Sequence, residues 1–452
     1  MNLLKYKQNP LIFGTIILTA TGLLSRLIGF FYRIFISHAF GEESMGIYQL
    51  VGPVLALSFS FAAAGIQTAI SKHVASEPTS KDYKSSLRFL LVGCLLAFIL
   101  STSYSLIIYF YSTPIATFFL KEPACAPLLR ILAFSFPFSA LHACINGYYF
   151  GIKKTALPAL TGFTESICRT VTVFLLYEYA LSHDIVPSIS FAIVGIVIGE
   201  ISSIIISLLA VMLRFIYLDK FVHFFDAAMF PQNSFYLTFK KIGTMALPLS
   251  SNRVILSILQ SIEAIYIPYM LQRYGYSSED ALRIFGVLTG MALSLVLFPC
   301  ALTNSASVLL LPIVSEAEMN QNHNKITRTI QGALKFSIGF GFFFTFIFFF
   351  LGPLAGTFLF HSELAGEFIV AFSFICPFLY ISTTFSSILH GLGKTKITLF
   401  INITSLLIRI AFVFLCIPLV GIQGYFQGAL IAQLFSCFCY IFSLRKYIVN
   451  KT

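Results

Sequence analysis

Apolar runs long enough to cross a lipid bilayer recur along almost the whole chain, separated by short polar connections. A helix needs about 20 residues to span the hydrocarbon core. We expect spans at residues 11–37, 46–70, 87–112, 127–150, 157–179, 187–213, 242–270, 284–313, 331–352, 366–390, 397–418 and 422–443. The pattern therefore predicts an all-α polytopic membrane protein with about 12 transmembrane helices.

An internal repeat relates the two halves of this pattern. A shift of 240 residues overlays Pro137-Phe138 on Pro377-Phe378, Lys154-Thr155 on Lys394-Thr395, and Arg169 on Arg409. The repeating unit contains six spans, and an even number of spans preserves the orientation of each unit. We therefore predict two six-helix bundles, at 1–215 and 242–452, related by a pseudo-two-fold axis along the membrane normal. A cytoplasmic linker at 216–241 joins them.

The basic residues are distributed unevenly among the connections. The chain is 58% hydrophobic and only 10% charged, with a formal net charge of +11 that could suggest nucleic acid as a partner. Twenty Lys and Arg lie in one alternate set of connections and three in the other. This asymmetry is the positive-inside signal of membrane topology. It predicts a multi-pass protein of the cytoplasmic membrane with both termini cytoplasmic, a retained first helix and no nucleic-acid partner.

Motifs that would indicate an enzyme or a metal site are missing from the sequence. The string Gly391-Leu-Gly-Lys-Thr395 lacks the first glycine and the spacing of a phosphate-binding loop, and no H-E-x-x-H occurs. The nine cysteines form no C-x-x-C pair. We therefore expect no catalytic residue, no metal ligand and no bound cofactor.

The first span carries two arginines on one polar face. Thr15, Thr19, Gly22, Arg26, Gly29 and Arg33 are spaced so that they lie on the same side of a helix. An arginine near the middle of a bilayer costs about 3 kcal/mol even on the most lenient scale. We expect Arg26 to face a wet cavity or an anionic partner. Arg33 either shares that face or extends to the interface.

Four further arginines lie within spans, and three of them are candidate site residues. Arg253 continues a polar face of the seventh span, which is the repeat equivalent of the first. Arg169 and Arg409 occupy matching places in the fifth and eleventh spans. Glu165 lies four residues before Arg169, so a local ion pair is an alternative to a role in binding there. No acid lies close to Arg409 in the sequence.

Acidic residues are fewer than arginines in the spans. Glu200 lies at the centre of the sixth span, and such a carboxylate should be protonated, pair with an arginine or bind a cation. Glu165 and Glu263 are two further acids near the arginines of the spans. His142 with Asn146 indicates a satisfied polar pair between helices. An excess of guanidinium groups suits an anion, and their fork geometry suits phosphate or pyrophosphate.

Several motifs resemble one family of membrane exporters. S-R-L-I-G-F-F-Y-R at 25–33, G-I-Y-Q-L at 46–50, A-I-S-K at 69–72, G-V-L-T-G-M-A-L at 286–293 and L-P-I-V-S-E-A at 311–317 carry the similarity. They resemble the stage V sporulation protein B and lipid II flippase branch of the multidrug/oligosaccharidyl-lipid/polysaccharide (MOP) exporter superfamily. The resemblance implies a MATE-like, V-shaped pair of bundles that flips undecaprenyl-pyrophosphate-linked sugars outward.

The resemblance also bears on particular residues. It implies that Arg26 lines the central cavity and is essential, whereas the family's second arginine is displaced by one position to Arg33. Many relatives carry two additional C-terminal spans that form a groove for the lipid tail. We expect only 12 spans here, so the tail would use an opening between the bundles, or the substrate differs. The first span has no acid of the kind associated with drug–cation antiport.

We therefore predict a flippase that moves a lipid-linked anionic saccharide by alternating access, with peptidoglycan precursors during spore formation as the leading cargo. Arg26 and Arg253 are the expected pyrophosphate ligands, with Arg33, Arg169 and Arg409 as further substrate-binding cations. Glu200, with Glu165 and Glu263, is the expected coupling or counter-charge site. The driving force is left open between Na⁺, protons and the membrane potential.

Two other functions stay open on the sequence. A cation-coupled multidrug exporter would depend on Glu200 and tolerate loss of Arg26. A non-transporting membrane scaffold for cell-wall enzymes would depend on its cytoplasmic loops instead. Expected partners are therefore a lipid-linked anionic saccharide, membrane lipids and enzymes of cell-wall synthesis.

Overall fold

A computed structural model describes residues 10–76, 83–217 and 232–449, and within these ranges the chain is helical with no strand. The first half contains α2 (Pro10–Phe59), the π-helix η1 (Ser60–Ala64), α3 (Gly65–Ser76), α4 (Tyr83–Phe110), α5 (Ser112–Pro114), the π-helix η2 (Ile115–Phe119), α6 (Cys125–Ala133), α7 (Ser135–Gly151), α8 (Ala156–Ser182) and α9 (Ser190–Tyr217). The second half contains α11 (Gln232–Tyr274), α12 (Ser278–Gly286), the π-helix η3 (Val287–Ala292), α13 (Leu293–Val296), α14 (Cys300–Met319), α15 (His323–Phe360), α16 (Glu363–Ser373), α17 (Cys376–Gly391), α18 (Thr395–Leu415), α19 (Ile417–Val420) and α20 (Ile422–Val449).

The all-α membrane fold predicted from the sequence is confirmed, but the count of 12 spans is not. Within the described ranges, eight helices are long and apolar enough to cross a membrane, or ten if each of two bent pairs is one span. The bent pairs are α6 with α7, at 45°, and α16 with α17, at 58°. The predicted span 284–313 is divided among the end of α12, η3, α13 and α14.

The first two predicted spans run together as one continuous helical segment, Ile17–Ser76, of 60 residues. Gly41 interrupts α2 with φ 81° and ψ 175°, a conformation that residues with a Cβ rarely adopt. A straight helix of 60 residues would be about 90 Å long, roughly three times the hydrocarbon thickness. The glycine therefore lets the chain change direction between two apolar runs without leaving helical structure for long.

The chain packs as two compact units. Unit 1 holds the residues up to Gly29 and those from Leu50 to Ile258, and unit 2 holds Phe30–Gln49 and the residues from Leu259 onward. Long helices α2 and α11 each contribute to both units. The predicted domain limits at 215 and 242 follow the repeat and stay predictions. Residues 218–231 of the predicted linker lie outside the described part of the chain.

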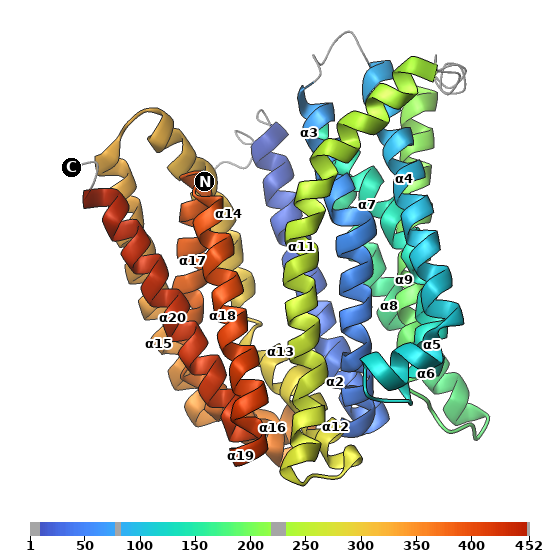
Figure 1. Cartoon of the computed structure of the whole chain (residues 1–452), viewed down its shortest axis with the longest axis vertical. Coiled ribbons are helices and arrows are strands. Elements are labelled where there is room, and N and C mark those ends of the chain that lie inside the picture. The colour runs from blue at the N-terminus through green and yellow to red at the C-terminus, as the bar shows by residue number, and fades with distance from the viewer. Residues whose placement is uncertain (1–9, 77–82, 218–231, 450–452) are drawn as a thin grey trace. The chain divides into compact units, whose positions relative to one another are not determined.

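Unit 1 is a helical bundle in which α4, α7, α8 and α9 lie alongside one another (Figure 1). Its core contains fully buried apolar side chains, among them Ile70, Leu87 and Cys144. A Cβ at Gly147 of α7 would lie 2.5 Å from the backbone oxygen of Gln67, so the absent side chain lets α7 approach α3. Small residues at helix contacts allow such close approach in membrane bundles.

Unit 2 is a second bundle, in which α15, α17, α18 and α20 form a side-by-side group (Figure 1). Val314, Ile388 and Leu389 are almost completely buried in its core. The α2 segment Phe30–Gln49 also packs in this unit, where Phe30 and Phe298 have ring centroids 5.3 Å apart. The middle segment of α2 therefore belongs to unit 2, whereas the parts of α2 before Phe30 and after Gln49 belong to unit 1.

Candidate functional site

Two arginines of unit 1 are exposed and carry no ionic partner. Arg26 lies on α2 and Arg253 on α11, and both side chains are exposed. Neither forms a hydrogen bond or an ion pair with a side chain in the described ranges. A guanidinium without a counter-charge retains all five of its donors for another group. Both predicted pyrophosphate ligands are thus available to bind an anionic group.

Arg253 lies one turn before a fixed contact between α11 and η1. Ser257 and Ser60 are buried, and their hydroxyl oxygens are 2.7 Å apart. One turn before Arg253, Ser250 lies so close to Gly65 that a Cβ at that glycine would be 2.1 Å from the Ser250 hydroxyl. The neighbouring turns of α11 therefore hold Arg253 in place while its own side chain stays exposed.

The other arginine of the first span lies in unit 2. Arg33 belongs to the α2 segment Phe30–Gln49 and is half-buried. Arg26 lies before Gly29 and belongs to unit 1. The structure therefore assigns the two arginines of one predicted polar face to different units.

A cluster of ionisable groups lies inside unit 1, on three helices. His142 comes from α7, Glu165 and Arg169 from α8, and Glu200 from α9. Glu165 and Arg169 form the local ion pair that their spacing indicated. Glu200 is only 8% exposed, and its Oε2 has no hydrogen-bond partner. His142 Nδ1 is the nearest basic atom recorded for this oxygen, at 3.7 Å.

Close helix packing brings these groups together. A Cβ at Gly199 would lie 3.1 Å from the backbone oxygen of Glu165, so α8 and α9 approach one another more closely than most side chains allow. Ser203 of α9 also donates to the backbone oxygen of Thr161 at 3.0 Å. One ligand-type atom from each of His142, Glu165 and Glu200 lies within 4.8 Å of the others. Each of these residues could be identified in the sequence separately, whereas only the structure shows that three helices bring them together.

The His142 ring is oriented by two neighbours. Asn146 Nδ2 lies 2.7 Å from His142 Nε2, and Thr161 Oγ1 lies 3.1 Å from the same nitrogen. The predicted pairing of His142 with Asn146 is therefore present. It satisfies one ring nitrogen only, and it turns the other toward Glu200. Helical spacing could not indicate this orientation, because Glu200 is 58 residues further along the chain.

A second ion cluster lies in unit 2. Arg409 of α18 donates from Nη2 to Glu263 Oε2 of α11 at 2.6 Å, and the hydroxyl of Tyr425 on α20 donates to Glu263 Oε1 at 3.3 Å. Both oxygens of this carboxylate thus have partners. The sequence showed no acid near Arg409 because its partner is 146 residues away. Arg409 and Arg169 are repeat equivalents, and both are ion-paired.

The pair borders a cavity of about 250 Å³ within unit 2. Apolar residues such as Phe285 and Phe372 form most of its wall, and Gln260 and Gln433 add amide groups. Arg409 Nε, also on this wall, is buried without a hydrogen-bond partner. The cavity can hold a small group that accepts one hydrogen bond from a guanidinium.

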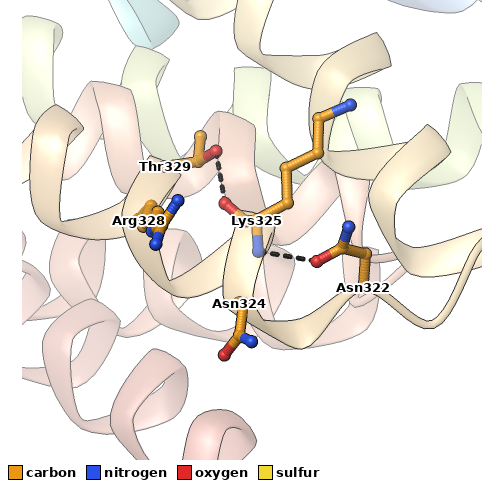
Figure 2. Close-up of a pocket in the computed structure, with 5 residues that line it drawn as sticks. All are labelled: Asn322, Asn324, Lys325, Arg328 and Thr329. Carbon is orange, nitrogen blue, oxygen red and sulfur yellow. Dashed lines mark hydrogen bonds between the residues drawn. The ribbon is translucent and has the colours of Figure 1, made fainter.

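A third hollow lies at the start of α15 and is lined by Asn322, Asn324, Lys325, Arg328 and Thr329. Figure 2 shows that two of its polar side chains form hydrogen bonds to the backbone of the same helix. The side chain of Asn322 accepts a hydrogen bond from the backbone nitrogen of Lys325 at 2.9 Å, and Thr329 donates to the backbone oxygen of Lys325 at 2.7 Å. Lys325 also pairs with Glu316. These contacts cap the helix, so we do not count this hollow as a candidate site.

Comparison with known families extends over most of the chain. The family described as "Polysaccharide biosynthesis protein" matches residues 11–318, which is more than half of the 452 residues. A second family, MatE, matches residues 254–415. The two matches overlap, and together they extend over residues 11–415.

Curated relatives show the same similarity. Stage V sporulation protein B of Bacillus subtilis (strain 168) is 24% identical over 417 residues, covering 91% of this chain and 79% of that protein. Lipid II flippase MurJ of the same strain is 22% identical over 459 residues, covering 94% and 80%.

Solved structures share the fold. An inward-facing MATE family multidrug transporter of the MOP superfamily aligns with a TM-score of 0.73 at 16% identity, covering 97% of this chain and 98% of that chain. Lipid II flippase MurJ in an inward closed conformation aligns with a TM-score of 0.72 at 18% identity, covering 96% and 90%. At these identities the likeness shows the fold, which agrees with the predicted MATE-like architecture. The chain therefore belongs to the polysaccharide biosynthesis protein family and, as its motifs predicted, to the MOP superfamily of flippases and exporters.

Proposed function

We propose that this protein moves an undecaprenyl-pyrophosphate-linked saccharide across the bacterial cytoplasmic membrane by alternating access of its two units. Peptidoglycan lipid II or a related cell-wall precursor is the leading cargo, and spore formation is the leading setting. The observation that carries the proposal is the contrast among the arginines: Arg26 and Arg253 are exposed and unpaired, whereas Arg169 and Arg409 are neutralised by acids.

The free arginines have the right chemistry for this cargo. A guanidinium without a counter-charge inside an apolar span is costly unless water or an anion compensates it. Its planar fork binds two oxygens of a phosphate group at once. Arg26 and Arg253 come from the first and seventh spans, which are repeat equivalents. We infer that one pyrophosphate group contacts both of them, and that Arg33 acts later along the same path.

The relatives support this cargo over others. One relative is named a lipid II flippase and another a stage V sporulation protein, and the matching family is named for polysaccharide biosynthesis. In this proposal both termini are cytoplasmic, the step is transport rather than covalent chemistry, and no cofactor is bound. The expected partners are the lipid-linked saccharide, the surrounding lipids and enzymes of cell-wall synthesis.

A cation-coupled multidrug exporter is the second candidate. The MatE match at 254–415 and the buried carboxylate of Glu200 favour it. A drug cation would be attracted to carboxylates and repelled by unpaired guanidinium groups. The exporter therefore predicts that Arg26→Ala leaves transport intact, whereas the flippase predicts that this change abolishes it. A non-transporting scaffold predicts that neither Arg26 nor Glu200 matters.

The decisive experiment is translocation of a labelled lipid-linked pyrophosphate saccharide in proteoliposomes that contain the full chain. A hydrogen bond to a charged group contributes about 1.5–3 kcal/mol, so Arg26→Ala and Arg253→Ala should each slow flipping by about ten- to a hundredfold. Arg130→Ala is the matched control, because Arg130 is already bonded to Ser112 at 2.8 Å. Wild-type flipping by Arg26→Ala would overturn the proposed site.

A further inference from the structure

Two histidine rings lie stacked on each other in unit 2. His38 belongs to the α2 segment Phe30–Gln49, and His361 directly follows the last residue of α15. Their ring centroids are 4.2 Å apart, and the ring planes are inclined by 21°. The two residues are 323 positions apart, so no sequence motif joins them. The fold therefore brings together two side chains of the type that binds metals most often in proteins.

Both rings are exposed, and their nitrogens are not engaged by other described residues. Neither His38 nor His361 forms a hydrogen bond or an ion pair in the described ranges. His183 of unit 1 is also exposed, but its Nδ1 lies 2.9 Å from Ser182 Oγ and 3.0 Å from the backbone oxygen of Tyr179. The ring nitrogens of the stacked pair can therefore bind a group from outside the chain.

The backbone holds His361 in a conformation that favours glycine. Its φ is 51° and its ψ 36°, in the left-handed region, at the position after a helix where glycine is usual. A Cβ makes this conformation unfavourable. The next residue, Ser362, accepts a hydrogen bond from the backbone nitrogen of Ala365 at 3.2 Å and caps α16. A histidine thus occupies a place better suited to glycine, and helix caps fix its Cα on both sides.

We propose that His38 and His361 form a site for a divalent transition-metal ion such as Zn²⁺ or Cu²⁺. Imidazole nitrogen suits these ions, whereas Mg²⁺ and Ca²⁺ prefer oxygen ligands. Metal–nitrogen bonds of about 2.0–2.1 Å place two ligand nitrogens about 3–4 Å apart, which is close to the separation of the two rings.

Binding requires a small change in the two side chains. Stacked rings do not direct their lone pairs at one point, so each ring turns about its Cβ–Cγ bond until one nitrogen faces the ion. Both rings are exposed, and no hydrogen bond to a described residue opposes the turn. Water completes the coordination of the ion, because the pair supplies two ligands only.

The bound ion ties α2 to the corner between α15 and α16 within unit 2. His38 lies between the first and second predicted spans, and His361 lies between the ninth and tenth. The uneven distribution of basic residues predicts that both connections face outward. The ion therefore comes from the external medium and is no cofactor of transport, so the site does not depend on the proposed cargo.

The first test is pulsed electron paramagnetic resonance of Cu²⁺ bound to the full chain, without an affinity tag, in lipid nanodiscs at constant pH. We expect the signature of two coordinated imidazoles. His38→Gln and His361→Gln should each remove it and weaken binding at least about tenfold, because the second ligand acts at high effective concentration. His183→Gln is the matched control, since that ring stacks on Tyr179 at 4.2 Å but has no second imidazole beside it. It should keep the signal.

A second test separates metal binding from folding. Zn²⁺ should raise the melting temperature of the wild type, because it binds the native arrangement, and Mg²⁺ should not. His361→Gly suits the left-handed backbone, so without metal it should melt at the wild-type temperature or above, yet lose the effect of Zn²⁺. The site is overturned if the two-imidazole signal is absent from the wild type or persists in either glutamine variant. A Zn²⁺ effect that persists in His361→Gly would overturn it as well.

Discussion

Gly46 and Gly286 meet backbone to backbone inside unit 2. A Cβ at Gly286 would lie 2.5 Å from the backbone nitrogen of Gly46, and a Cβ at Gly46 would lie 2.1 Å from the backbone oxygen of Leu282. The two glycines are 240 residues apart, which is the shift of the internal repeat. The contact therefore joins two glycines at equivalent positions of the sequence repeat, and it lies wholly within unit 2.

We predict that Gly286→Ala destabilises the protein by about 1–3 kcal/mol, the usual cost of inserting a methyl group into a filled contact. The added carbon would overlap backbone atoms of Glu42 and Gly46, which cannot turn aside as a flexible side chain would. Thermal unfolding in detergent measures the change. Gly52→Ala is the control on α2, because its added Cβ would meet nothing within 4 Å. Equal melting temperatures for the two variants would contradict the contact.

An ion pair lies beside the contact of Gly46 with Gly286. Arg283 Nε donates to Glu42 Oε2 at 2.5 Å, and Glu42 is largely buried while Arg283 is mostly exposed. This hydrogen bond and the charge of Glu42 raise the pKa of Arg283, so the guanidinium stays charged across the pH range of any assay. Exposed ion pairs contribute about 0.2–1 kcal/mol. We predict that Glu42→Arg and Arg283→Glu each lower the melting temperature and that the double exchange restores it; independent losses would show that the pair is not coupled.

The pair of Glu263 with Arg409 should behave differently. Removing one partner of a buried ion pair typically costs about 3–5 kcal/mol, because the other charge is left unpaired. We therefore predict that Arg409→Met is strongly destabilising and that Arg409→Met with Glu263→Leu recovers much of the loss. Unfolding of the single and double variants in detergent measures this. A double variant less stable than either single variant would mean that the two side chains act independently.

Arg26 and Arg253 should act on one cargo group. Two side chains that contact the same pyrophosphate are coupled, so the losses from their single replacements should not add. We predict that Arg26→Ala with Arg253→Ala flips the labelled lipid little more slowly than the worse single variant. Arg26→Lys should recover only part of the rate, because an ammonium group keeps the charge but loses the fork. Fully additive losses in the proteoliposome assay would place the two arginines at separate steps.

The sequence indicated most of the fold, and the physical reason is the bilayer. Apolar runs of bilayer length can satisfy their backbone only as helices, so position and type of each element follow from composition. The repeat could be recognised in the sequence because Pro137 and Pro377 lie at equivalent positions of the two halves, as do Arg169 and Arg409. The number of spans was harder to predict, because the helical segment of residues 17–76 holds two apolar runs separated only by a kink at Gly41. Hydropathy does not show where a helix ends inside a continuous apolar segment.

Partnerships between charged residues were only partly predictable. The pair of Glu165 with Arg169 is local, so helical spacing alone indicated it. The partner of Arg409 was not indicated, because Glu263 reaches it from another helix 146 residues away.

By itself, the sequence determined that this chain is a helical membrane protein of the MOP superfamily with arginines inside its spans. Only the tertiary structure decided which of these charges are neutralised: within the described ranges Arg169 and Arg409 are paired with acids, whereas Arg26 and Arg253 have no ionic partner. The reason is that periodicity fixes the face of a helix on which a charge lies. The packing of helices distant in sequence decides what that face meets.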